Sequence, residues 1–259
     1  MTGSSTLPPL VFHERGSGHP VVLIHPLGAD QRYWDFLALP GRHLLTYNLP
    51  GHGGTPPAGG PYSIEDLGDQ LAAAILARGS GPASIVGVSI GGLIAQHVAM
   101  QHPAAVDHLV IADAVSVYPE EVARNLAGRG ETVLRDGLSA IVDPTLSLWF
   151  SQDFTAADGP AVSLTRSMVL GSSPRGYADA CSALVAVDLS SRVASIEAPT
   201  LVMCGRDDLP AFVNAAPVLA STIRDARLCW IEGGRHAAVL ECSDQSQREL
   251  DSFLPRAGA

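Results

Sequence analysis

The chain has 259 residues, and a hydrophobic content of 46% with 16% charged residues is sufficient for one large α/β domain, alone or with an insert. The formal net charge is −10, and all 16 basic residues are arginines. This acidic balance argues against nucleic acid and anionic membranes as partners. Residues 1–10 lack the pattern of a signal peptide and no apolar run reaches the length of a membrane span, so we expect a cytoplasmic protein.

The side chains that commonly bind metals show no metal-site spacing. The four cysteines have no C-x-x-C pattern; they are Cys181, Cys204, Cys229 and Cys242. Cys204 and Cys229 lie in strand-like runs, which predicts buried thiols in a reducing compartment. Because no ligand cluster is recognisable, we expect neither a metal nor an organic cofactor.

Strand and helix signals alternate along the first 115 residues. Apolar runs predict strands at 10–14, 20–25, 43–48, 84–88 and 106–112. Ser63-Ile64-Glu65-Asp66 has the pattern of a capping box, which predicts a helix that ends near Arg78. A second helix, rich in small residues, is expected from residue 90 to His102-Pro103.

The pattern changes between residues 116 and 196, where strand-like runs largely disappear. Asp143-Pro144 and Ser173-Pro174 each predict an N-cap followed by proline at the first helical position. We interpret 116–196 as a helical cap that is inserted into a core formed by 1–115 and 197–259. Beyond the cap, strands are expected at 200–205 and 226–231, with helices from Phe212 and over Ser243–Leu254.

This alternation predicts an α/β fold with a mainly parallel sheet and helices on both faces. Ligands bind at the carboxyl ends of the strands in such sheets. Three groups of polar residues follow predicted strands closely, and they are Ser89, Asp207-Asp208 and His236. We therefore expect them to meet at one edge of the sheet.

Ser89 lies in Gly87-Val88-Ser89-Ile90-Gly91, which has the pattern G-x-S-x-G between a predicted strand and a predicted helix. Small neighbours allow the sharp turn that lifts a serine hydroxyl off the sheet edge. The following helix places free N–H groups beneath any negative charge that forms there. The pattern and its placement predict that Ser89 is a nucleophile.

A serine hydroxyl needs a base, and the base needs an acid that orients it. His236 lies in a Gly-rich loop after the last predicted strand, which favours it as the base. The G-x-x-D spacing from Gly205 favours Asp208 as the acid and leaves Asp207 as the alternative. The order Ser…Asp…His is that of the α/β-hydrolase arrangement.

The oxyanion of an acyl transfer needs two N–H donors. We predict the N–H groups of Ile90, directly after the nucleophile, and of Leu27, in the loop after the strand at 20–25. His25 is expected to anchor that loop. Further scaffold or packing positions are Asn48, His52, His97, His102 and His108.

Over almost its whole length the chain resembles the α/β-hydrolases, in the serine motif, the motifs around Asp208 and His236, and the loops at 25–28 and 51–53. Within that superfamily it is most similar to the 3-oxoadipate enol-lactonases. The closer features are Leu27-Gly28-Ala29-Asp30, Trp34-Asp35, Gly60-Pro61-Tyr62-Ser63-Ile64, Ser89-Ile90-Gly91-Gly92-Leu93-Ile94, Trp149-Phe150, Ser173-Pro174-Arg175-Gly176-Tyr177-Ala178 and Asp188-Leu189. The chain departs from those enzymes at Asn48 and Pro50, where they usually carry Asp and Arg.

The resemblance implies a serine hydrolase of aromatic catabolism that opens a small enol-lactone through an acyl-enzyme. A carboxylate on such a substrate would need a cation, and the predicted cap offers Arg124, Arg129, Arg135, Arg166 and Arg175. Trp149 either packs the cap onto the core or walls the pocket above Ser89. We favour the second, substrate-binding role, because Trp149-Phe150 matches the enol-lactonase cap.

The same motifs fit other functions. An esterase, a C–C bond hydrolase or a ring-forming or ring-opening enzyme of specialised metabolism would keep every residue named above. A ligand receptor with an idle triad is an alternative from a different class. All of these readings share a small molecule, such as a lactone or ester, as the partner.

Overall fold

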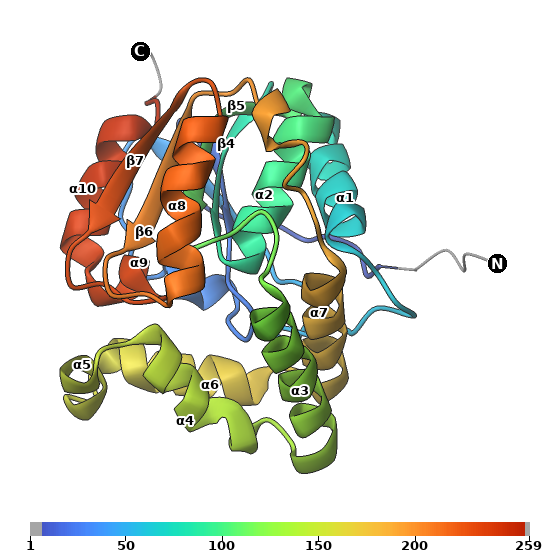
Figure 1. The fold of residues 1–259 in the computed structure, drawn as a ribbon. Helices are drawn as coiled ribbons and strands as arrows, with labels where there is room; N and C mark the ends of the chain where they lie inside the picture. Colours follow the sequence, from blue (N-terminus) through green and yellow to red (C-terminus); the bar gives the residue numbers. More distant parts are fainter. Residues whose placement is uncertain (1–6, 257–259) are drawn as a thin grey trace.

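A seven-stranded sheet with the order β1-β3-β2-β4-β5-β6-β7 runs through the protein (Figure 1). The computed structural model describes residues 7–256, and residues 1–6 and 257–259 lie outside this range. Only β1 runs antiparallel to its neighbour, which confirms the predicted mainly parallel sheet. The strands are β1 (His13–Gly16), β2 (His19–Ile24), β3 (Arg42–Thr46), β4 (Ala83–Val88), β5 (Val106–Ala112), β6 (Thr200–Gly205) and β7 (Ala226–Ile231).

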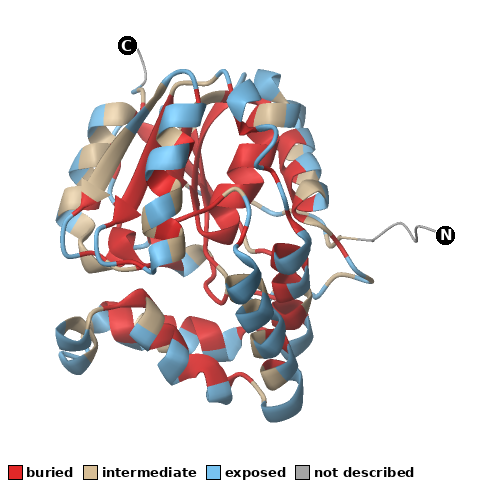
Figure 2. Ribbon diagram, in the orientation of Figure 1, coloured by how far each residue is buried: buried red, intermediate tan, exposed pale blue. Residues whose placement is uncertain are grey.

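Helices cover both faces of the sheet, as predicted, so alternate strand residues enter two separate clusters. Val22 and Ile24 pack with residues of α1 (Ile64–Ala77), α2 (Ile90–Gln101) and α8 (Pro210–Thr222). Val21 and Leu23 pack with residues of η1 (Gln31–Trp34), α9 (Ala238–Glu241) and α10 (Ser243–Phe253). Burial on both faces explains the continuous apolar runs, and strands β4 and β6 are buried throughout (Figure 2).

The element boundaries agree closely with those read from the sequence. The strands at 106–112, 200–205 and 226–231 have the predicted bounds, whereas the edge strand β1 begins at His13 rather than at residue 10. The capping box is present at α1, where Asp66 N–H donates to Ser63 Oγ over 3.0 Å and Ser63 N–H donates to Asp66 Oδ2 over 2.8 Å. Short 3-10 turns, η2 (Pro103–Ala105) and η3 (Val193–Ser195), precede β5 and β6.

Five helices between β5 and β6 form a layer of their own at the carboxyl edge of the sheet, in the lower part of Figure 1. We call them the cap helices: α3 (Glu120–Asp136), α4 (Ser139–Trp149), α5 (Gln152–Ala156), α6 (Pro160–Gly171) and α7 (Pro174–Ala186). The segments that lead into and out of this layer lie side by side, because Val117 pairs with Asp188 and Leu189 N–H donates to Ser116 O over 2.9 Å. The division into a core and an inserted cap at 116–196 stays a prediction.

The predicted helix start at Asp143-Pro144 is wrong. Pro144 lies inside α4, which begins at Ser139. A proline within a helix removes one hydrogen bond and crowds the preceding turn. Burial of Ile141, Val142, Leu146 and Trp149 on one side of α4 outweighs that cost. The predicted start at Ser173-Pro174 is correct, since Ser173 Oγ accepts from Gly176 N–H at the N-terminus of α7.

Of the two cysteines predicted to be buried, only Cys204 is. Cys229 is half-buried because β7 is the edge strand of the sheet and has a neighbour on one side only. All four cysteines have free thiols. Within residues 7–256, no helix combines the length and the apolar character that crossing a bilayer requires.

Candidate active site

Ser89 occupies a strained turn between β4 and α2. Its backbone has φ 56° and ψ −115°, which non-glycine residues rarely adopt, and its N–H donates to Ala112 O over 3.0 Å. A Cβ atom on Gly87 would lie 2.1 Å from the carbonyl oxygen of Gly91, and one on Gly91 would lie 2.4 Å from that of Ile24. The two glycines of the motif are therefore required by close backbone contacts around Ser89.

Ser89, His236 and Asp208 form a continuous hydrogen-bonded chain. Nε2 of His236 lies 3.1 Å from Ser89 Oγ, and Nδ1 of His236 lies 2.9 Å from Asp208 Oδ2. A histidine that donates from Nδ1 to Asp208 leaves Nε2 free to accept the serine proton. All three residues are buried, with 5% of Ser89 and 8% of Asp208 exposed. The geometry is that of a nucleophile, a base and an orienting acid, and the catalytic roles stay predictions.

The structure distinguishes the two candidate acids. Asp208 is turned inward to His236, and its Oδ1 accepts from Leu209 N–H over 2.6 Å. Asp207 is exposed, and its backbone N–H donates to Gly234 O over 3.0 Å. Only Asp208 therefore has the position that orienting the imidazole requires.

The two predicted oxyanion donors lie beside Ser89. Ile90 is the first residue of α2, so its N–H has no partner within the helix. Leu27 follows β2 and lines the same cavity as Ser89. Between residues 7 and 256, neither of these N–H groups donates to another protein atom. Both are available to a ligand, and their role in holding an oxyanion stays a prediction.

Buried histidines fix the loops behind these donors. His25 Nδ1 lies 2.9 Å from Pro26 O, and its Nε2 accepts from Leu49 N–H over 3.0 Å. His52 Nδ1 lies 3.0 Å from Pro50 O. Burial lowers the pKa of His25 to about 3 and that of His52 to about 4, so both are neutral. Asn48 joins the loops as well, since its Oδ1 accepts from Gln31 N–H and its Nδ2 donates to Gly53 O. These contacts are those of scaffold residues, as expected.

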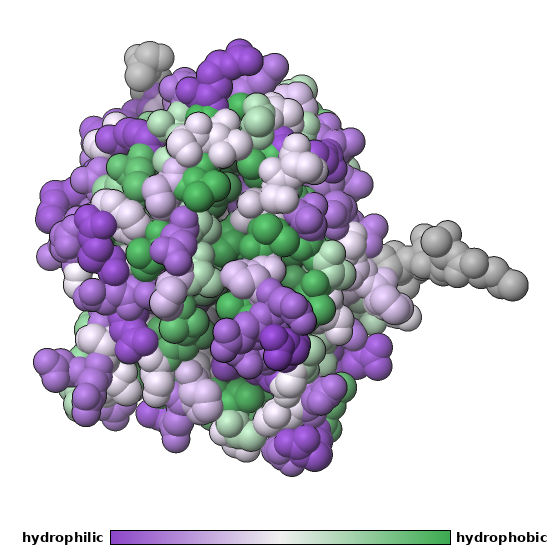
Figure 3. Space-filling view, viewed as in Figure 1, coloured by the Kyte–Doolittle hydropathy of each residue, from purple (hydrophilic) through white to green (hydrophobic). Residues whose placement is uncertain are grey.

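A mostly apolar cavity of about 210 Å³ separates Ser89 and His236 from the cap helices. On the face shown in Figure 3, apolar side chains gather along the junction between the sheet layer and these helices. Residues from the core loops, α3, α4, α7 and α8 line the cavity: Pro26, Leu27, Ser89, Tyr118, Val122, Asn125, Leu126, Arg129, Leu148, Trp149, Tyr177, Leu184, Leu209, Phe212 and His236.

Trp149 lines this cavity and also packs against the core. Only 3% of its surface is exposed, and its ring meets that of Tyr33 edge-on at 5.9 Å. Its carbonyl oxygen accepts from Ala237 N–H, directly after His236, over 3.1 Å. The two alternatives weighed for Trp149 are therefore combined in one side chain, and its contact with substrate stays a prediction.

The five arginines of the predicted cap differ in their surroundings. Arg124, Arg135 and Arg175 are exposed, and Arg166 is half-buried. They pair with Glu120, Asp136, Asp179 and Asp143, respectively. Arg129 alone lines the cavity, where it donates to the hydroxyl groups of Tyr177 and Thr145. Within the described range, no carboxylate pairs with Arg129. Its charge therefore faces a nearly apolar pocket without a protein counter-ion.

Three residues of the site were not singled out from the sequence. The ring of Phe212 lies 4.3 Å from that of His236, and the ring of Tyr118 meets Phe212 at 6.2 Å. Asp113, directly after β5, lies near Asp208. The rule that sites lie at carboxyl ends of parallel strands could have found Asp113. Tyr118 and Phe212 carry no comparable signal, since aromatic residues are common in any core.

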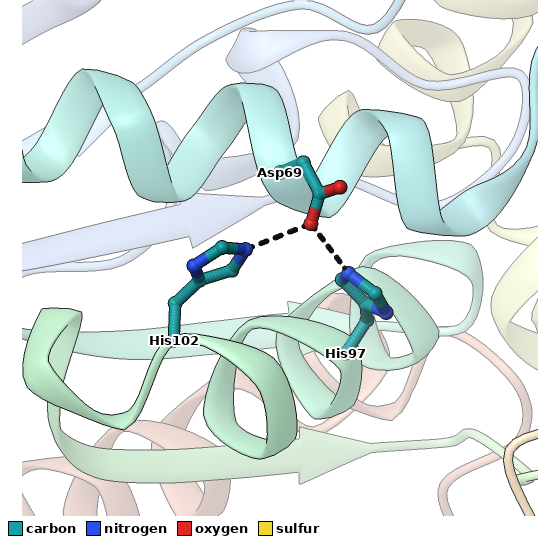
Figure 4. Close-up of side chains that lie close together, drawn as sticks. All are labelled: Asp69, His97 and His102. Carbon is teal, nitrogen blue, oxygen red and sulfur yellow. Dashed lines mark hydrogen bonds and ion pairs between the residues drawn. The ribbon is translucent and has the colours of Figure 1, made fainter.

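A second polar cluster lies away from the cavity, between α1 and α2 (Figure 4). Nε2 of His97 and Nε2 of His102 lie 2.8 Å and 2.7 Å from Oδ1 of Asp69. In the described part of the chain, the buried Nδ1 of His97 has no partner, which fits the tautomer that donates from Nε2 to Asp69. A metal ion would need the lone pair of that Nε2 and an acceptor for Nδ1–H. The cluster instead fits a hydrogen-bonded link between the two helices.

Comparison with known proteins agrees with the observed fold. The family model for the alpha/beta hydrolase fold matches residues 19–242. "Putative carbamate hydrolase RutD" of Pseudomonas syringae pv. syringae is 29% identical over 94% of this chain and 98% of its own length. "3-oxoadipate enol-lactonase 2" of Acinetobacter baylyi is 29% identical over 82% of this chain and 79% of its own length. The crystal structure of the enol-lactonase from Burkholderia xenovorans superposes with a TM-score of 0.87, 26% identity and coverage of 96% and 99%. The chain belongs to the alpha/beta hydrolase family.

Proposed function

We propose that the chain is a serine hydrolase that opens a small lactone, in the first instance 3-oxoadipate enol-lactone or a related enol-lactone. The observation that carries this proposal is the series of hydrogen bonds from Ser89 through His236 to Asp208 beside a mostly apolar cavity. The similarity to enol-lactonases in sequence and in structure supports the substrate class.

The mechanism follows from the hydrogen bonds. Ser89 Oγ attacks the lactone carbonyl carbon while its proton passes to His236 Nε2, and Asp208 stabilises the imidazolium. The N–H groups of Leu27 and Ile90 hold the carbonyl oxygen as it gains charge. The ring C–O bond then breaks, and the enol oxygen takes the proton from His236. The enol converts to the ketone, and a water that His236 deprotonates releases the acid from Ser89.

The cavity favours a compact substrate that carries a negative charge. Its volume of about 210 Å³ is below the range of roughly 300–1,000 Å³ typical of sites for drug-sized ligands. Arg129 offers the only arginine side chain among the lining residues. A free carboxylate on the lactone would supply the counter-ion that Arg129 lacks. In this proposal, residues 116–196 form a cap that selects the substrate.

A carbamate is the second candidate, because the first relative named above is a carbamate hydrolase by name and covers more of this chain. The same nucleophile, base and oxyanion donors would serve an attack on a carbamate carbonyl. A carbamate would leave Arg129 without a partner unless it also carried an acid group. For that reason we place the enol-lactone first.

A substrate panel tests the proposal. Purified protein should hydrolyse an enol-lactone with a free carboxylate faster than its methyl ester, a saturated lactone, a carbamate and an aryl ester. A serine-directed phosphonate should label Ser89 and block all turnover. If the phosphonate labels Ser89 but a carbamate is the best substrate, the chain is a serine hydrolase whose substrate class is carbamates rather than enol-lactones. Turnover without labelling of Ser89 would contradict the serine mechanism.

A further inference from the structure

Tyr118 differs from the other four tyrosines of the chain in the surroundings of its hydroxyl group. The hydroxyl group of Tyr177 accepts from Arg129 Nε–H. Three further tyrosines have hydroxyl groups that are buried without a partner among residues 7–256, and they are Tyr33, Tyr47 and Tyr62. The hydroxyl group of Tyr118 is not enclosed in this way, and Tyr118 lines the cavity that contains Ser89. It therefore faces the cavity.

The backbone before α3 directs Tyr118 inward. Val117 pairs with Asp188, and successive side chains of an extended segment point to opposite sides. Val117 is accordingly 40% exposed, whereas Tyr118 is only 9% exposed. The ring of Tyr118 meets that of Phe212 edge-on at 6.2 Å, and the ring of Phe212 lies 4.3 Å from that of His236. Phe212 thus links Tyr118 to the side of the cavity on which His236 lies.

The hydroxyl group of Tyr118 is a hydrogen-bond donor at neutral pH. Burial raises the pKa of Tyr118 above its usual range, and a hydrogen bond with the side chain of Ser89 opposes this rise only in part. The other polar lining side chains besides Ser89 and His236 belong to the cap helices, and they are Asn125, Arg129 and Tyr177. Tyr118 is therefore the phenol that lies beside the nucleophile and keeps its proton.

Opening of a lactone places charge on two oxygen atoms of the substrate. The predicted donors at Leu27 and Ile90 serve the carbonyl oxygen. The leaving oxygen takes its proton from His236, so it must face the side of the cavity on which His236 lies. After attack, this oxygen and Ser89 Oγ are bonded to the same carbon. A group that hydrogen-bonds to Oγ can therefore reach the leaving oxygen as well.

We propose that Tyr118 is a catalytic residue that donates a hydrogen bond to the leaving oxygen of the substrate. The bond between Ser89 Oγ and the acyl carbon forms, and the bond between that carbon and the leaving oxygen breaks. The proton of Ser89 reaches the leaving oxygen through His236 Nε2, while Tyr118 keeps its own proton and stabilises the charge during the transfer. This inference rests on the proposed serine mechanism and adds a donor to it.

The test compares Tyr118→Phe with the wild type on the ethyl, trifluoroethyl, phenyl and 4-nitrophenyl esters of acetic acid. All four give the same acyl-enzyme, so differences in kcat/KM report its formation. For the ethyl ester, whose leaving oxygen keeps its charge, we expect kcat/KM to fall roughly ten- to a hundredfold. For the 4-nitrophenyl ester, whose ring spreads the charge, the fall should be below about threefold. Tyr47→Phe, which loses a buried hydroxyl group outside the cavity, is the matched control and should behave as the wild type.

The outcomes distinguish this inference from the proposed function. An equal loss on all four esters, or no loss, overturns the role of Tyr118 at the leaving oxygen and leaves the serine hydrolase in place. Ester hydrolysis that survives Ser89→Ala contradicts the serine mechanism itself. Tyr118→Phe keeps the ring against Phe212, and thermal unfolding checks that it folds. If it does not fold, 3-fluorotyrosine at position 118 keeps the size and strengthens the donor. The ratio of kcat/KM for the ethyl ester to that for the 4-nitrophenyl ester should then rise, and a constant ratio overturns the inference.

Discussion

The sheet layer and the cap helices are built in different ways. Strands β4 and β6 are buried along their whole length, whereas α3 buries only Gly130 and Val133 and leaves Leu134 57% exposed. All nine histidines lie outside residues 116–196, and the cap helices face the cavity with mostly apolar side chains, Asn125, Tyr177 and Arg129. Under the proposed function, the proton-transfer groups thus belong to the sheet layer, and the cap helices supply shape and one charge. Changes in the sheet layer should alter kcat, and changes in the cap should alter substrate preference.

The largest effect should come from the sheet layer. Ser89→Ala removes the nucleophile, and we expect kcat to fall by at least about a thousandfold for every substrate, since the triad residues act as a unit. Steady-state kinetics on a lactone and an aryl ester measure this. Ser163→Ala, on the exposed side of α6, is the control and should behave as the wild type. If Ser89→Ala lowered kcat for only one of the two substrates, the division between a sheet layer that sets kcat and cap helices that set substrate preference would not hold.

In the cap, Arg129→Gln should act on binding. A hydrogen bond to a charged group contributes about 1.5–3 kcal/mol, so KM for a lactone with a free carboxylate should rise roughly ten- to a hundredfold. KM for the methyl ester of the same lactone should change much less. Arg135→Gln, on the same helix but paired with Asp136 at the surface, is the matched control. If KM rose equally for both substrates, Arg129 would be a packing residue only.

Acid should destabilise the sheet layer in particular. The folded-state pKa values of about 3 for His25 and about 4 for His52 lie below the unfolded value of about 6.5. The unfolded chain therefore binds more protons below pH 6.5, and stability present above that pH is lost as pH falls toward 4 and 3. At pH 5 the loss is on the order of 2 kcal/mol for each histidine. Thermal unfolding between pH 7 and 5 measures it.

Substitution of these histidines sharpens the acid prediction. His52→Gln should lower stability at pH 7 and should flatten its decrease toward pH 5, because one proton-binding site of the unfolded chain is gone. His13→Gln, at an exposed position of β1, should leave the pH dependence as it is in the wild type. An unchanged slope in His52→Gln would show that other groups govern acid unfolding.

The smallest effect is expected at Trp149, which belongs to both regions. Trp149→Phe keeps a ring against Tyr33 but enlarges the cavity above Ser89. We expect the ratio of kcat/KM between a bulky acyl ester and a small lactone to rise severalfold, within the range of about 1–3 kcal/mol for a reshaped apolar pocket. Leu134→Ala, exposed on α3, is the control. A constant ratio in a folded Trp149→Phe protein would assign Trp149 to packing alone.

The sheet layer could be predicted from the sequence better than the cap helices. Strands buried on both faces have continuous apolar runs, and the turn at Ser89 needs glycines at fixed positions, so local sequence specified both. The surroundings of Arg129 depend on how α3, α4 and α7 pack, and nothing near it in sequence distinguishes it from Arg135. The helix start predicted at Asp143-Pro144 is wrong for the same reason, because burial of one side of α4 overrides a local helix-start signal. Asp113 lies near Asp208 only because β5 pairs with β6, and no local pattern around Asp113 specifies that pairing.

The pairing of Val117 with Asp188 determines which segment of this protein could be exchanged for that of a relative. The chain leaves the sheet layer and returns to it at one point, so the segment between is joined to the rest like an inserted module whose ends meet. Exchanging such a segment leaves the span across the junction unchanged, whatever its length or sequence. If the predicted division into core and cap holds, we expect that residues 118–187 can be exchanged as a unit for the matching segment of a relative, provided that contacts with the core such as Ala237 N–H to Trp149 O are kept. New specificity would then arise by replacement of one block, without stepwise substitution around Ser89.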